Sequence, residues 1–100
     1  MNLLKNTELL VSQVAQYLNK RYVGNDYVIS SIFDGKNPNN NSVWLVEEEK
    51  YENYGKNSLI ITTEEIYEKL KNNSEVSFIL SLNPRLDFFK IVDEFFLIKP

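Results

Sequence analysis

The order in which helical and extended patterns alternate along this 100-residue chain is the feature that most constrains its fold. Apolar residues recur every three or four positions over residues 3–22, which predicts an amphipathic helix that ends before Gly24. Near the other end, Asn83 can cap a second helix whose first residue is Pro84, and the apolar positions of this helix continue to Phe96. The chain therefore predicts a helix at each end, with its extended segments between them.

The segments between these helices contain β-branched and aromatic runs separated by polar loops. Residues 43–46 are apolar on both alternating faces, which predicts the centre of a sheet that a helix covers on at least one side. Thr62 and Glu65 form a capping-box pattern, which adds a short helix through about Asn72. The expected strands cover residues 27–33, 42–48, 59–61 and 76–82, and we expect the first two to be antiparallel.

This α-β-β-β-α-β-α order predicts one α+β domain over residues 1–100. We expect two layers, in which helices pack against a mainly antiparallel sheet of about four strands. The patterns leave the strand order open, and residues 95–98 fit either the end of the last helix or an edge strand. With 43% hydrophobic residues the chain can form one core, and without cysteine that core depends on packing alone.

The absence of histidine and cysteine narrows the chemistry that the chain can perform. Imidazole and thiolate groups supply much of the acid–base, nucleophilic and metal-binding chemistry of enzymes. We therefore expect a non-enzymatic protein with no cofactor and no bound metal. A chain without cysteine also fits the reducing cytoplasm, and neither a signal-peptide pattern nor an apolar stretch of about 20 residues indicates export or a membrane partner.

The net charge of −3 is unevenly distributed along the chain. Residues 1–25 carry three cations and one carboxylate, residues 26–75 carry five cations and ten carboxylates, and residues 76–100 carry three of each. The acidic middle repels the phosphates of nucleic acids, so we expect no direct binding to DNA or RNA. A basic protein, including one whose basic groove otherwise holds nucleic acid, is the better electrostatic match.

A short acidic and aromatic segment at the end of the second predicted strand is the strongest candidate for binding such a partner. Carboxylates attract a basic surface over a distance, and tyrosines are common anchors at protein interfaces. The predicted partner-binding residues are Glu47, Glu48, Glu49, Tyr51, Glu52 and Tyr54. The alternative interpretation is an ordinary solvated loop whose two tyrosines fold back onto the core.

These features favour a small acidic inhibitor or immunity-type antagonist that occupies a basic site on another protein. The leading alternative is a dimeric chaperone or assembly subunit that uses a hydrophobic surface. Phe88 and Phe89 are adjacent and point about 100° apart on a helix, so one of them can reach the rim of the apolar face. A homodimer through this Phe-rich C-terminal helix is therefore part of the alternative.

A remote alternative is a Mg²⁺-dependent nuclease. Asp34 precedes the second predicted strand, and Glu48-Glu49-Lys50 provides an E-x-K sequence at its end, an arrangement similar to that of restriction-type nucleases. The usual proline before the aspartate is missing, and the E-x-K sequence lies at the end of the strand rather than inside it. We therefore assign no catalytic residue.

Overall fold

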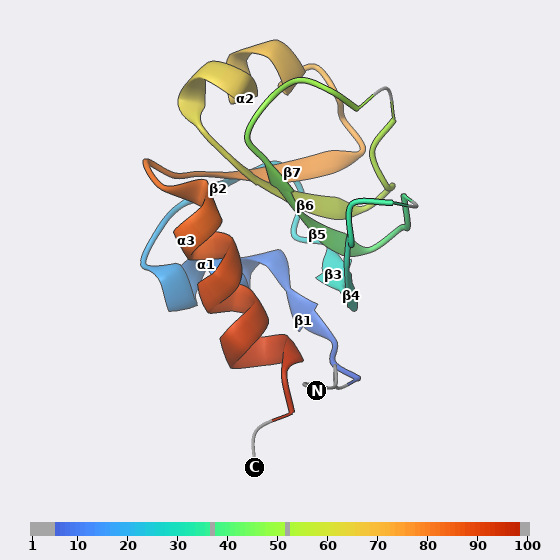
Figure 1. Cartoon of the computed structure of the whole chain (residues 1–100), viewed down its shortest axis with the longest axis vertical. Helices are drawn as coiled ribbons and strands as arrows, with labels where there is room; N and C mark the ends of the chain where they lie inside the picture. The colour runs from blue at the N-terminus through green and yellow to red at the C-terminus, as the bar shows by residue number, and fades with distance from the viewer. Residues whose placement is uncertain (1–5, 37, 52, 99–100) are drawn as a thin grey trace.

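A five-stranded mixed sheet lies at the centre of the protein, and helices lie on both of its faces (Figure 1). The computed structural model describes residues 6–36, 38–51 and 53–98. The strand order is β2 (Tyr22–Val23), β7 (Val76–Leu80), β6 (Ser58–Thr62), β5 (Ser42–Val46) and β4 (Ser31–Ile32). A separate two-stranded sheet pairs β1 (Leu9–Leu10) with β3 (Val28–Ile29). The central strand is therefore β6, and β5, which was expected at the centre, lies beside it.

The strands from β4 to β7 run parallel to one another, and β2 is antiparallel to its neighbour β7. The α+β class is confirmed, but the expectation of a mainly antiparallel sheet is wrong. The cause is the loop between β4 and β5, which returns the chain to the edge of the sheet at which β4 begins. The carbonyl of Asn41 accepts a hydrogen bond from the amide of Ser30 at 2.8 Å. The chain therefore enters β5 beside the start of β4 rather than beside its end.

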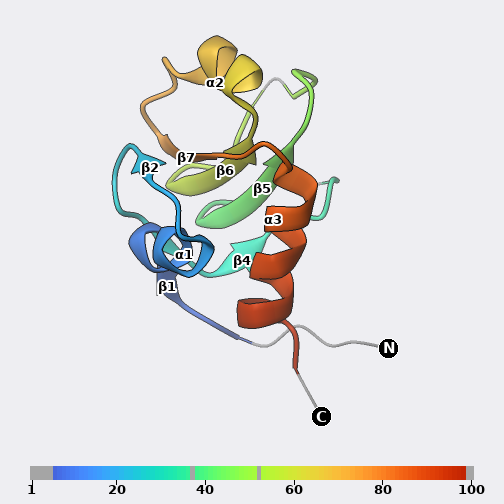
Figure 2. The same cartoon turned by 90° about the vertical axis from the view of Figure 1, so that its left-hand side faces the viewer.

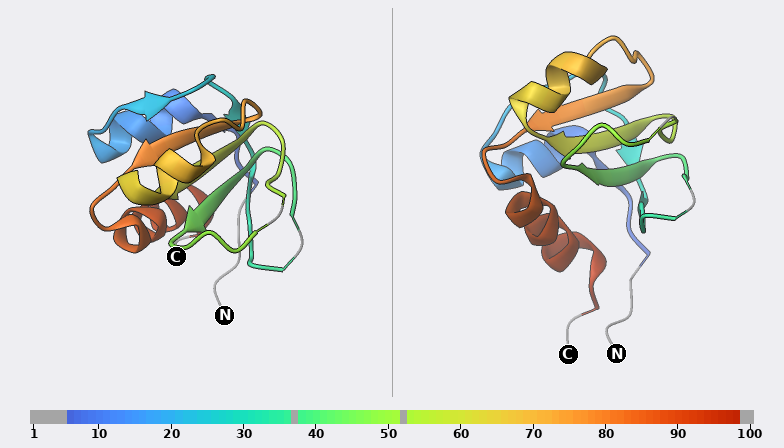
Figure 3. Two further views of the ribbon diagram at one scale, coloured as in Figure 1. Left: turned by 90° about the horizontal axis from the view of Figure 1, so that it is seen from above. Right: turned by 45° about the horizontal axis from the view of Figure 1, so that its top comes forward.

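Helices cover both faces of the sheet, so the domain has three layers rather than the two expected. On one face lie α1 (Val11–Leu18) and α3 (Pro84–Ile91), which continues into the π-helical turn η1 (Val92–Phe96), and on the other lies α2 (Glu64–Leu70). Figure 2 shows the sheet between these layers, and Figure 3 shows α1 and α3 apart from each other on the face opposite α2. None of the helices in the described ranges has the length and hydropathy that crossing a membrane requires.

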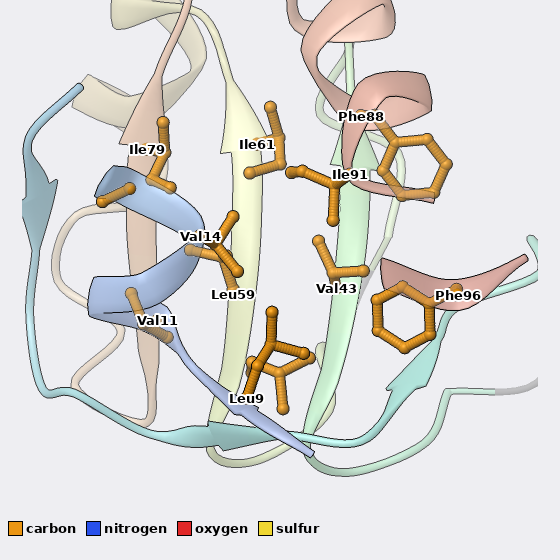
Figure 4. Packing of buried hydrophobic residues seen from close by; sticks show 12 residues of the cluster. Leu9, Val11, Val14, Val43, Leu59, Ile61, Ile79, Phe88, Ile91 and Phe96 are labelled. Carbon is orange, nitrogen blue, oxygen red and sulfur yellow. The ribbon is translucent and has the colours of Figure 1, made fainter. Parts of the chain in front are cut away.

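The side chains of the central strand alternate between two hydrophobic cores, and all five residues of β6 are buried. Leu59 and Ile61 belong to the core beneath α1 and α3, where Ile91 of α3 lies close to them (Figure 4). Ile60 points to the opposite face and packs beneath α2. The buried residues of this second core are Phe33, Trp44, Val46, Ile60, Ile66, Val76 and Phe78.

Helix α1 is shorter than the helix predicted over residues 3–22. Residues 1–5 lie outside the described residues, and β1 directly precedes the helix. The Ser12 amide donates a hydrogen bond to Asp26 Oδ1 at 2.7 Å, which fixes the helix start from a distant loop. Asn19 then adopts a left-handed conformation with φ of 56°, and this ends the helix.

The other two helices begin at side-chain caps. Thr63 Oγ1 accepts a hydrogen bond from the Ile66 amide at 3.3 Å, so the cap of α2 lies one residue after the predicted Thr62. Thr62 is buried in β6, where its hydroxyl donates to the backbone of β5. Asn83 caps α3, as predicted, by accepting from the Leu86 amide at 3.2 Å.

The phenylalanines of the last helix have different environments. Phe88 is buried at 8% exposure, whereas Phe89 is 54% exposed, which confirms that one of the two reaches the rim. Of residues 95–98, Phe95 and Phe96 belong to η1 and are helical, whereas Leu97 forms a single β-bridge and Ile98 has no regular structure. Most of the aromatic bulk near the C-terminus is thus core, and Phe89 is the member that faces solvent.

Candidate functional site

The parallel strands β5, β6 and β7 end at the same edge of the sheet, and the acidic residues gather there. Three carboxylates follow β5, two more begin α2 after β6, and one arginine lies in the first turn of α3 after β7. We call this region, formed by residues 47–50, 63–65, 69 and 85, the carboxyl edge. In Figure 2 the ends of the three strands lie on the side where α3 begins.

The three predicted glutamates at the end of β5 are exposed, and each has a cationic neighbour. Glu47 forms an ion pair with the guanidinium of Arg85, through two of its nitrogens. Glu48 Oε1 lies 3.7 Å from Lys50 Nζ, and Glu49 Oε2 lies 3.9 Å from Lys69 Nζ. Long pairs between exposed side chains contribute about 0–1 kcal/mol each. The last two carboxylates are therefore held only weakly.

Two further carboxylates at this edge were not predicted as part of the site. Glu64 and Glu65 are exposed in the first turn of α2, and within the described residues neither forms an ion pair. Their charge is favourable there because the N-terminal end of a helix carries a partial positive charge. The capping pattern placed Glu65 at a helix start, but only parallel strands bring that start to the same edge as Glu47. The edge thus gathers five carboxylates against three cations, namely Glu47, Glu48, Glu49, Glu64 and Glu65 against Lys50, Lys69 and Arg85.

The two predicted tyrosines fold back onto the second core instead of pointing outward. Tyr51 and Tyr54 are half-buried, and their ring centroids lie 5.5 and 5.2 Å from that of Trp44. The Tyr54 hydroxyl is buried without a hydrogen-bond partner among the described residues. Burial raises the pKa of Tyr54, and the nearby Glu49 carboxylate and Tyr51 raise it further. The tyrosines therefore fold back as the alternative interpretation expects, whereas partner binding by this loop stays a prediction, and Glu52 lies outside the described residues.

Two features hold the loop between β5 and β6 in place from its buried side. Gly55 is buried so closely against the loop between β4 and β5 that a Cβ atom would lie 1.8 Å from the Asn39 carbonyl oxygen. The indole Nε1 of Trp44 donates to Ser42 Oγ at 2.7 Å, and Ser42 Oγ donates to the same carbonyl at 2.7 Å. The acidic residues therefore project from a loop whose base is packed and hydrogen-bonded.

An exposed apolar stripe lies beside the carboxyl edge. Leu82 is fully exposed just before α3, and Leu86 and Phe89 follow at 50% and 54% exposure. Their spacing of four and three residues places Leu86 and Phe89 on one side of the helix, with Leu82 at its start. Arg85 lies between the two leucines and pairs with Glu47, so the stripe and the acidic loop are neighbours. The sequence predicted that one of Phe88 and Phe89 reaches the rim of the apolar face, but it did not predict the exposure of the two leucines, although their spacing was visible.

The residues of the nuclease hypothesis do not form a metal site among the described residues. Asp34 is exposed, and its Oδ1 accepts a hydrogen bond from the Lys36 amide at 2.9 Å. No three histidine, cysteine, aspartate or glutamate side chains of the described ranges come close enough together to hold a metal ion. This hypothesis therefore gains no support from the geometry.

Comparison with known proteins adds no family to this description. No protein-family model matches the chain, and no curated protein is significantly similar to it. The function of the protein is therefore inferred from the geometry of the carboxyl edge and of the apolar stripe.

Proposed function

We propose that this protein binds a basic protein and blocks it, as an inhibitor or immunity-type antagonist, through the carboxyl edge. The observation that supports this most is the gathering of five carboxylates after the parallel strands β5 and β6, against only three neighbouring cations. Carboxylates on one side of a small protein create a field that attracts a basic surface before contact. The same field repels phosphate backbones, so the partner is a protein rather than a nucleic acid.

Contact then proceeds by an exchange of ion partners. Glu48 and Glu49 lie in long, exposed pairs that cost little to break, and Glu64 and Glu65 have no pair to break within the described residues. Arginine or lysine side chains of the partner form charge-assisted hydrogen bonds with these carboxylates. The bound domain then covers the basic site sterically. We place this interaction in the cytoplasm, because the sequence contains no cysteine.

Tyr51 and Tyr54 support this interface from the core side of the loop. Their rings pack on Trp44 and keep the loop in one conformation, so the carboxylates are positioned before the partner arrives. A loop that is ordered in advance loses less conformational entropy on binding than a mobile one.

The test is an affinity capture from a lysate of the source organism, eluted in a salt gradient. Wild-type protein is compared with E48K/E49K, which changes the carboxyl edge, and with E8K/E75K, which changes exposed glutamates outside it. Each substitution adds two units of charge, so both variants move from −3 to +1 and differ only in where the charge changes.

We expect a basic partner that wild type and E8K/E75K retain, that moderate salt releases, and that E48K/E49K fails to retain. Exposed charges attract one another over about 8–10 Å at moderate salt, so the position of the substitution matters more than the net charge. A partner that all three proteins retain equally, or no basic partner at all, contradicts the proposal.

A further inference from the structure

We propose that the apolar stripe of Leu82, Leu86 and Phe89 is the anchor of this same interface. The partner then presents apolar side chains flanked by lysine or arginine. The inference rests on the proposed function, because it takes the partner to be basic. It assigns the anchoring role to α3 instead of to the half-buried tyrosines of the loop.

The stripe has the rigidity that an anchor needs. The Phe89 ring packs edge-on against the buried Phe88, with centroids 5.7 Å apart and planes at 74°. Leu86 lies on a helix that is capped at its start by Asn83 and packed on the core through Ile91. Side chains on a packed helix lose little freedom when a partner covers them, which favours binding.

The stripe and the carboxylates are also joined directly. Arg85 lies between Leu82 and Leu86, and its guanidinium binds the Glu47 carboxylate at the start of the acidic loop. An apolar patch with charged residues at its border is the arrangement of a protein interface, in which polar groups surround a desolvated centre. On the loop side Arg85 is paired with Glu47, and Glu48 and Glu49 follow, so this border is net negative and the complementary border of the partner is basic.

A second copy of this chain fits the stripe less well than a basic partner. Stable interfaces bury about 800 Å² on each side, and obligate dimers are more apolar still, whereas two of the three side chains here are only about half-exposed. A dimer through α3 would also bring together two domains that each carry a charge of −3, with their acidic edges close to the contact. The small apolar centre and its acidic border suit a hetero-interface.

The test uses two defined peptides and the full-length protein labelled with ¹⁵N. The first peptide is an amphipathic helix of about four turns with leucine on one face and lysine on the other, and the second has serine in place of leucine at equal charge. Chemical shifts map the binding of each peptide to wild type, to L86S/F89S and to V23S/V28S. The last variant removes exposed valines from β2 and β3, outside the stripe, and serves as the matched control.

We expect the leucine peptide to shift residues 82–90 and 47–49 of the wild type, and to bind L86S/F89S about tenfold more weakly or worse. V23S/V28S should bind it as wild type does, and the serine peptide should bind every protein weakly. Equal binding of the leucine peptide by wild type and L86S/F89S overturns the inference. A wild-type dimer in sedimentation equilibrium that L86S/F89S dissociates also overturns it, because a second copy then covers the stripe.

The E48K/E49K variant separates this inference from the proposed function. If it binds the leucine peptide as tightly as wild type while L86S/F89S does not, the anchor stands and the acidic edge fails as the site of attraction. If it loses both peptides while L86S/F89S keeps the leucine peptide, the acidic edge stands and the anchor fails.

Discussion

Replacing Tyr54 by phenylalanine should stabilise the protein, because it removes a buried hydroxyl that has no partner among the described residues. A buried polar group without a hydrogen bond costs about 1–3 kcal/mol. Phenylalanine keeps the ring contacts with Trp44 and Tyr51, whose centroids lie 5.2 and 6.0 Å away. We expect the free energy of unfolding to rise by about 1 kcal/mol, which corresponds to about 4–8 °C in Tm for a domain of this size.

The same substitution has a predicted pH dependence. Burial raises the pKa of Tyr54 in the folded state, so the unfolded chain releases this proton first as the pH rises. Below the unfolded pKa of about 10, Tyr54 is protonated in both states and the stability of the wild type does not change through this group. As the pH rises from there through the higher folded pKa, the wild type loses stability. The advantage of Y54F over wild type should therefore grow above about pH 10.

The assay is urea unfolding followed by Trp44 fluorescence, at neutral pH and in alkaline buffers. Y51F is the control, because the Tyr51 hydroxyl is not a buried group without a partner, and its effect should stay within about 0.5 kcal/mol. If Y54F lowers the free energy of unfolding by about 1 kcal/mol, the hydroxyl makes a hydrogen bond in solution and the reasoning is wrong.

Three further substitutions test the packing that positions the site. G55A should destabilise by about 3 kcal/mol or more in denaturant unfolding, because its Cβ would lie 1.8 Å from a backbone oxygen of the facing loop; wild-type stability would refute that packing. T63A should cost about 1 kcal/mol by thermal unfolding through loss of the α2 cap, while T63S should be nearly neutral. D87A should cost about 2 kcal/mol, because Asp87 is buried, accepts from the Ser81 hydroxyl at 2.5 Å and lies 3.7 Å from Lys20 Nζ; an unchanged unfolding midpoint would contradict this.

The local signals in the sequence predicted the elements better than their arrangement. Asn83 and Pro84 mark the start of α3 correctly, because a cap and a fixed φ depend on neighbouring residues alone. The cap of α2 was predicted one residue early, since Thr62 and Thr63 are adjacent and burial in β6 decides which of them is free to cap. The start of α1 is held by the local Gln13 side chain, which accepts from the Leu10 amide, and by Asp26, fourteen residues beyond Ser12 in the chain; no local pattern reveals the second contact.

The direction of the strands was the larger error, and it also concealed part of the site. A loop of polar residues between two apolar runs is compatible with a hairpin or with a return to a parallel strand, and side-chain alternation is the same in both. Because the strands are parallel, Glu64 and Glu65 lie at the same edge as Glu47. The stripe was missed because sequence alone does not distinguish exposed leucines from buried ones. Leu82, which is fully exposed before α3, and Leu86, which is half-exposed within it, both fit the pattern of core residues.

The most direct test of electrostatic attraction by the carboxyl edge is the association rate constant of the captured partner, measured as a function of ionic strength for wild type, E48K/E49K and E8K/E75K. We expect the wild-type rate to fall about tenfold or more as salt rises. We also expect E48K/E49K to associate slowly at every salt concentration, and E8K/E75K to stay close to wild type. A wild-type rate that does not respond to salt, or an equal loss in both variants at their common charge of +1, would contradict a role for the carboxyl edge in attracting the partner.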